Sequence, residues 1–163
     1  MSYATRRDKA RRLLDRHDLD ALLVTSFINV TYLTGFTGDD SYLLVTQDRD
    51  VLISDQRYTQ QLEEECPDVE LQIRGPGTKM VPFTARALKK AKSRRVGFES
   101  QAMTVALRDQ LAEAASGVEL APTSGWIEKL RAIKDRREIA ATRRACQLAR
   151  RALEVVRAKL TAE

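Results

Sequence analysis

The chain has 163 residues, 43% of them apolar, which suits one globular domain with little left over. No apolar run approaches the ~20 residues that a membrane span needs, and the first residues lack the apolar segment of a secretion signal. Two cysteines lie far apart, at Cys66 and Cys146, and form no metal-binding spacing. We therefore expect a cytoplasmic protein with reduced thiols and no membrane partner.

The net charge of +5 is concentrated at one end of the chain. Residues 131–163 hold ten Lys or Arg and four Asp or Glu, whereas the preceding 130 residues have a net charge of −1. Nucleic-acid binding requires several basic side chains on one face. Only the final segment could supply them, so nucleic acid is not the expected partner of the body of the chain.

The first third is dominated by three short apolar runs, at residues 21–24, 42–46 and 51–54. Their length and their Leu, Val and Ile content favour strands that are buried on both faces. The four polar residues between the second and third runs suit a hairpin. We predict a charged surface helix over residues 4–17, and a folded-back loop over residues 29–40 because its glycines tolerate positive φ.

The second half alternates between helical and strand-like patterns. The predicted helices cover residues 58–66, 80–92, 104–115 and 124–131, and the predicted strands cover 69–73, 96–98 and 118–120. Pro122 is expected to break the last strand. Such alternation favours parallel crossovers, so we predict an α/β fold with a mixed sheet of about six strands and helices on both faces.

A long helix is predicted over residues 136–160. Its apolar members recur at three- and four-residue steps, and Arg pairs recur every seven residues, at 136/137, 143/144 and 150/151. One face is therefore apolar and another cationic. An apolar stripe of this kind is expected to meet a partner.

Two stretches are candidates for ligand contact. Asp55-x-Arg57-Tyr58 follows a predicted strand, where Arg57 could hold a carboxylate by two parallel hydrogen bonds. The structural alternative is that Asp55 caps the next helix, Arg57 pairs locally and Tyr58 packs. The second candidate is Asp39-Asp40, whose charges would repel phosphate and which no phosphate-loop lysine follows.

Catalytic machinery is not apparent in the chain. His17 is the only histidine, so no Ser/His/Asp or Cys/His arrangement can be nominated. We therefore expect no catalytic residue and no metal ligand among these 163 residues.

Five ordered motifs carry a family resemblance. They are Asp20-Ala21-Leu-Leu-Val24; Asn29 with Tyr32-Leu-Thr-Gly35-Phe36; Asp55-x-Arg57-Tyr58; Val96-Gly-Phe-Glu99; and Leu130-Arg-Ala-Ile-Lys134-Asp135 with Glu138-Ile139. Together they resemble the amino-terminal, creatinase/prolidase-type domain of Xaa-Pro aminopeptidases and Xaa-Pro dipeptidases of the metallopeptidase M24 family. The resemblance implies a three-layer, ribonuclease H-like sandwich over residues 1–134. It also implies that residues 135–163 form a linker helix leading into a catalytic domain beyond this chain.

The resemblance also implies a function. The domain would shape the substrate cleft and pair subunits in a homodimer, while the catalytic domain of the same parent chain would hold two divalent ions (Mn, Co or Zn) and cleave a peptide. The loop bearing Asp39 and Asp40 would reach the neighbouring subunit's active site, where an acidic pair favours a peptide α-amino group.

Three alternatives remain open at this point. The chain could be a free-standing peptide-binding or scaffold module, or it could bind nucleic acid through its Arg-rich helix. Its parent could also be a creatine-type hydrolase instead of a peptidase.

Overall fold

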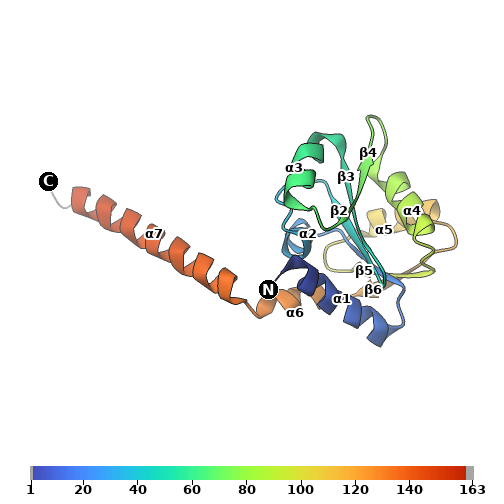
Figure 1. Cartoon of the computed structure of the whole chain (residues 1–163), viewed down its shortest axis with the longest axis horizontal. Helices are drawn as coiled ribbons and strands as arrows, with labels where there is room; N and C mark the ends of the chain where they lie inside the picture. The colour runs from blue at the N-terminus through green and yellow to red at the C-terminus, as the bar shows by residue number, and fades with distance from the viewer. Residues whose placement is uncertain (1, 161–163) are drawn as a thin grey trace. The chain divides into compact units, whose positions relative to one another are not determined.

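The computed structural model describes residues 2–160, which form two compact units, Ser2–Arg131 and the segment that begins at Ala132. The first unit is a six-stranded mixed sheet with helices on both faces (Figure 1). The three-layer α/β architecture predicted from the sequence is therefore confirmed.

The strands are β1 (Ala21–Val24), β2 (Tyr42–Thr46), β3 (Asp50–Asp55), β4 (Glu70–Arg74), β5 (Arg95–Glu99) and β6 (Glu119–Thr123). The helices are α1 (Tyr3–His17), α2 (Phe27–Thr34), α3 (Thr59–Glu65), α4 (Met80–Lys90), α5 (Val105–Ala114), α6 (Trp126–Ala132) and α7 (Arg136–Leu160), with a 3-10 turn, η1, at Gln56–Tyr58. The strand order in the sheet is β4-β3-β2-β1-β5-β6.

One strand runs against the others. β2 is antiparallel to both neighbours, β1 and β3, while β3–β4, β1–β5 and β5–β6 are parallel pairs. Five strands therefore end at the same edge of the sheet, and β2 begins there. In α/β sheets this edge is where ligands usually bind.

The core divides between the two faces of the sheet. In β1, Leu22 and Val24 pack with side chains of α1, α2, α3 and α6, whereas Ala21 and Leu23 pack with α4 and α5. This alternation follows from the two-residue period of a strand. All four residues are fully buried, which accounts for the continuous apolar run in the sequence.

The prediction of a loop over residues 29–40 is wrong in its first half, because α2 covers Phe27–Thr34. Val30 and Leu33 are buried against the sheet, so tertiary packing stabilises a helix too short to persist alone. Gly35 ends the helix at φ 85°, where its N–H donates to Thr31 O at 2.8 Å. Its positive φ marks a helix end, not an extended glycine loop.

Two further expectations are corrected. Pro122 does not break the last strand, because β6 lies at a sheet edge, where the missing N–H interrupts no central ladder. The helix α1 is not simply a surface helix, because both Arg6 and Arg7 are buried.

Arg7 joins four segments of the chain. Its Nε donates to Asp50 Oδ2 at 2.7 Å, its Nη2 donates to Asp68 Oδ2 at 2.6 Å, and its Nη1 donates to Leu33 O at 2.9 Å. The side chain is 2% exposed. A charge buried this deeply is tolerated because its donors meet two carboxylates and a carbonyl.

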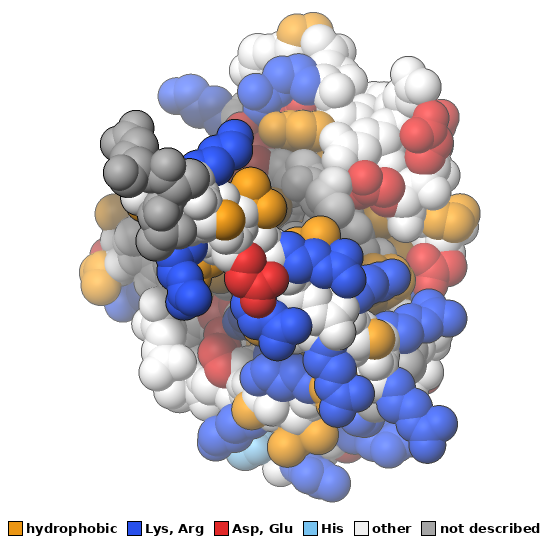
Figure 2. Space-filling view, turned by 90° about the vertical axis from the view of Figure 1, so that its left-hand side faces the viewer, with side chains coloured by type: hydrophobic (Ala, Val, Ile, Leu, Met, Phe, Trp, Pro, Cys, Tyr) orange, Lys and Arg blue, Asp and Glu red, His pale blue; other side chains and the backbone are white. Residues whose placement is uncertain are grey.

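The second unit contains α7, which begins with a reciprocal cap. Asp135 Oδ1 accepts the N–H groups of Arg137 and Glu138 at 2.8 and 3.0 Å, and Glu138 Oε2 accepts the N–H of Asp135 at 2.8 Å. This arrangement is a capping box. In the view of Figure 2, Lys and Arg are the prevailing charged side chains. Across residues 2–160, no helix is long and apolar enough to cross a membrane.

Replacing Arg7 with Leu should lower the free energy of unfolding by about 3 kcal/mol, because Asp68 loses its ion pair with Arg7 and the largely buried Asp50 keeps only its ion pair with Arg11. Urea denaturation followed by circular dichroism would measure the loss. Arg12→Leu, at an exposed position of the same helix, is the matched control and should cost less than about 0.5 kcal/mol. Equal losses in the two variants would contradict the role given to Arg7.

Candidate functional site

Two polar clusters lie at the edge where five strands end. The first, which we call the acidic-loop cluster, consists of Asp39 and Asp40 from the loop before β2, Asp55 at the end of β3, Arg57 in η1, and Arg74 at the end of β4. The second, the Asn29 bridge, consists of Glu99 at the end of β5, Asn29 from α2, and Glu128 and Arg131 from α6.

Asp55 is the buried centre of the acidic-loop cluster. It accepts the Arg57 N–H at 2.9 Å, which caps η1, as the structural alternative predicts. Its carboxylate also binds Arg57 Nε at 3.0 Å and Nη2 at 2.6 Å, and Arg74 Nη2 at 2.8 Å. The hydrogen bonds and positive charge of Arg57, followed by the charge of Arg74, lower the pKa of Asp55 even though burial opposes ionisation.

The acidic loop, which is the loop before β2 that carries Asp39 and Asp40, forms an ion pair with Arg57. Asp40 adopts a left-handed conformation at φ 52°, and its Oδ2 accepts Arg57 Nη2 at 2.7 Å. Asp39 Oδ1 accepts the Asp40 N–H at 2.8 Å. Within residues 2–160, Asp39 forms no ion pair with Lys or Arg. The structure thus brings Asp40, Asp55 and Arg57 into contact and leaves Asp39 at the exposed rim.

Tyr58 joins this cluster through its ring, over which the Arg57 guanidinium lies at 5.4 Å from the centroid. Its ring meets Phe36 edge-to-face, with centroids 5.6 Å apart, as in favourable aromatic pairs. Gly38 lies against both rings, because a Cβ built there would be 2.4 Å from Phe36 Cζ and 2.9 Å from Tyr58 Cδ1. The two rings and the glycine therefore set the path of the loop that carries Asp39 and Asp40.

The geometry limits what Arg57 can bind. Its Nε and Nη2, the fork that would hold a ligand carboxylate by two hydrogen bonds, already contact Asp55. The side chain is 61% exposed, and Nη1 has no hydrogen-bond partner within residues 2–160. Three aspartates against two arginines leave the cluster with one negative charge, so a cationic ligand is favoured over an anionic one.

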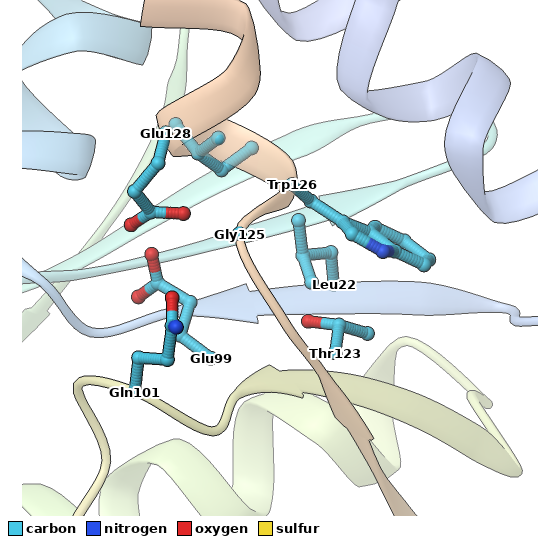
Figure 3. A pocket seen from close by; sticks show the side chains of 8 residues that line it. Leu22, Glu99, Gln101, Thr123, Gly125, Trp126 and Glu128 are labelled. Carbon is cyan, nitrogen blue, oxygen red and sulfur yellow. The ribbon is translucent and has the colours of Figure 1, made fainter.

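The Asn29 bridge had no assigned role in the sequence analysis. Glu99 is 7% exposed, and its Oε2 accepts the N–H groups of Thr25 and Ser26 at 2.7 and 2.8 Å. Asn29 Nδ2 donates to both Glu99 Oε1 and Glu128 Oε1 at 2.5 Å. The two carboxylates face each other (Figure 3).

Burial raises the pKa of Glu99, and the negative charge of Glu128 raises it further, whereas hydrogen bonds from Ser26, Asn29 and Thr25 oppose that rise. A cavity of about 10 Å³ lies beside the pair, with Gln101, Thr123 and Trp126 among its lining residues (Figure 3). It is large enough for about one water molecule.

The sequence held partial signals for this bridge. Asn29 and Glu99 belong to the family motifs, and Glu128 and Arg131 have the three-residue spacing of neighbours on a helix face. No local pattern joins Asn29 to Arg131, which is 102 positions away. His17, the only histidine, lies against Trp126 with ring centroids 4.6 Å apart.

Replacing Asp55 with Asn should lower the free energy of unfolding at pH 7 by about 2 kcal/mol, because charge-assisted hydrogen bonds to two arginines are weakened. Since the folded-state pKa of Asp55 lies below its ordinary value of 3.8, this stabilisation is present above pH 3.8. It is lost as pH falls through the folded-state value.

Urea denaturation of both proteins from pH 7 to below pH 3.8 would measure the difference, which should be largest at pH 7 and should shrink as the pH falls further below 3.8. The exposed carboxylate of Asp109 supplies the control variant, Asp109→Asn. A difference between wild type and Asp55→Asn that stays constant over this range would contradict the assignment.

Comparison with known proteins finds peptidases among the proteins similar to this chain. The Bacillus subtilis "uncharacterized peptidase YqhT" is 33% identical over 142 residues, which cover 87% of this chain and 40% of that protein. The Xaa-Pro dipeptidase from Bacillus anthracis matches with a TM-score of 0.89 and 28% identity, over 95% of this chain and 43% of that one. This chain therefore spans about two fifths of the length of both relatives.

An isolated domain gives a match over nearly its full length. The N-terminal domain of the cytoplasmic peptidase PepQ from Mycobacterium tuberculosis is 37% identical with a TM-score of 0.71, over 77% of this chain and 98% of that domain. The family model described as the creatinase/prolidase N-terminal domain matches residues 6–133. The resemblance inferred from the five motifs is thereby confirmed, and the chain belongs to the creatinase/prolidase N-terminal domain family.

Proposed function

We propose that this chain is the non-catalytic N-terminal domain of a cytoplasmic Xaa-Pro aminopeptidase or dipeptidase. The observation that carries the proposal is the match to an Xaa-Pro dipeptidase over 95% of this chain but only 43% of that enzyme. More than half of such an enzyme thus lies outside the matched region. In this proposal, residues 1–134 form the non-catalytic domain, and residues 135–163 lead into a catalytic domain of the same polypeptide.

The proposed catalytic domain would hold two divalent ions (Mn, Co or Zn), which would supply an activated water for hydrolysis. The residues described here do not fit such a site, since within residues 2–160 no three His, Cys, Asp or Glu side chains are placed to hold a metal ion. We therefore assign no step of hydrolysis to them. Their proposed role is to shape the substrate cleft and to pair two subunits in a homodimer.

The acidic loop is suited to contacting a substrate because it is held in place before any ligand arrives. Thr37 N–H and Oγ1 bind the two oxygens of Glu65 at 2.8 and 2.9 Å, and Ser41 Oγ binds Ser54 Oγ at 2.7 Å. Such preorganisation lowers the entropy cost of binding. Because the acidic-loop cluster has a net negative charge, we propose that Asp39 and Asp40 meet the α-ammonium group of a peptide.

An alternative from another class is binding of nucleic acid through α7. From residue 136 to residue 160 this helix holds eight Lys or Arg and two Asp or Glu. That excess favours a polyanion. Salt-sensitive DNA binding that is lost on truncation at residue 134 would support this alternative, and its absence would exclude it.

The proposed function predicts that Xaa-Pro peptides are hydrolysed by the full translation product of the gene and not by residues 1–163 alone. Both proteins would be assayed with Mn²⁺ on an Xaa-Pro dipeptide and a longer Xaa-Pro peptide, with Xaa-Ala peptides as the control. Hydrolysis by residues 1–163 would contradict the proposal. Failure of both proteins to cleave would favour a peptide-binding or scaffold module.

In the full translation product, Asp39→Asn should raise KM for a peptide with a free α-amino group about two- to fivefold, because one exposed ionic contact is lost. The same variant should not change KM for the N-acetylated peptide. Glu63→Gln, on an exposed face of α3, serves as the control. Equal effects on the free and acetylated peptides would argue against ammonium recognition by Asp39.

A further inference from the structure

The side chain of Asn29 is fully committed to its neighbours. It is 0% exposed, its two amide hydrogens are directed to Glu99 and Glu128, and its Oδ1 accepts Arg131 Nη1 at 3.0 Å. Only one orientation of the amide satisfies two carboxylates and a guanidinium at once. The bridge therefore holds three elements, β5, α2 and α6, in one arrangement.

The element that depends most on this bridge is α6. It has seven residues, too few to persist as an isolated helix in water. Its other attachments are apolar: Ile127 is 1% exposed in the core, Leu130 packs against the same core, and Trp126 lies against both that core and His17. Two of its seven side chains, Glu128 and Arg131, end at Asn29.

The charges of the bridge balance only with one added proton. With Glu99 and Glu128 both ionised, Arg131 leaves a net charge of −1; with one proton bound, the cluster is neutral. The charged groups that face Glu99 are Glu128 directly and Arg131 through Asn29, both from α6. The neighbours contributed by the β1–α2 connection, β6 and the segment after β5 are uncharged: Thr25, Ser26, Thr123 and Gln101.

We propose that the Asn29 bridge is a proton-sensitive latch, which holds α6 on the sheet edge while Glu99 is protonated and loosens when both carboxylates are ionised. The proposal goes beyond the proposed peptidase function, because it concerns how the last helix of the first unit is attached. It would hold equally in a scaffold module.

The direction in which pH changes the docking of α6 follows from the linkage between docking and protonation of Glu99. Releasing α6 removes Glu128 and admits water, so the pKa of Glu99 falls toward its ordinary value of 4.5. The docked state therefore binds the proton more tightly than the released state. Docking is favoured at low pH and weakens as pH rises from 4.5 through the docked-state pKa, by about tenfold in the docking equilibrium for a pKa difference of one.

Trp126 is the only tryptophan and stands at the start of α6, so it reports docking directly. The experiment measures acrylamide quenching of its fluorescence from pH 4.5 to pH 8 in the whole chain. A His17→Phe background keeps a ring against the indole and removes the imidazole as a second source of pH-dependent quenching. We expect quenching to increase along a single titration curve while far-UV circular dichroism loses no more than the contribution of the seven residues of α6.

Glu99→Gln in the same background mimics the protonated group and should keep Trp126 protected at every pH. Glu128→Gln removes the facing charge and should shift the midpoint to lower pH, which tests the latch even if Glu99→Gln does not fold. Glu113→Gln, exposed on α5, should titrate like the parent. Quenching that does not change with pH in the parent, or an unshifted midpoint in Glu128→Gln, would overturn the proposal.

Discussion

The buried guanidinium of Arg7 is the interaction on which the positions of the other elements depend. It binds the first residue of β3 through Asp50, the turn before β4 through Asp68, and the end of α2 through Leu33 O. Arginine suits this position because its rigid fork offers five donors and stays charged at any physiological pH. The starts of β3 and β4 and the end of α2 are thereby held together.

Both polar clusters depend on that arrangement and on the single reversed strand. Because β2 runs against its neighbours, the loop with Asp39 and Asp40 enters the sheet at the edge where β3 and β4 leave it. Asp40 can then share Arg57 with Asp55, although 17 positions separate it from Arg57. The same edge receives the ends of β1 and β5, which places Glu99 beside the start of α2.

The sequence predicted features that depend on residues close together in the chain better than features that depend on residues far apart. The strands, the hairpin and the long helix follow from local periodicity, and the cap from Asp55 to the next turn spans two residues. Helix α2 was missed because its eight residues show no amphipathic pattern and their packing on the sheet decides their conformation. Burial of Arg7 and the Asn29 bridge could not be foreseen, because their partners come from distant segments with no shared local pattern.

Helix α7 carries two sequence patterns, an apolar stripe and an arginine series, and both bear on what the helix can bind. A helix that bound only a polyanion would need its cationic face and nothing more. Ile139, Cys146, Leu153 and Leu160 recur every seven residues, beside an arginine series with the same period. Such a stripe stabilises a helix only when it is covered by other apolar groups. The Xaa-Pro dipeptidase match extends over 95% of this chain and 43% of that enzyme, so the matched segment belongs to a longer polypeptide there.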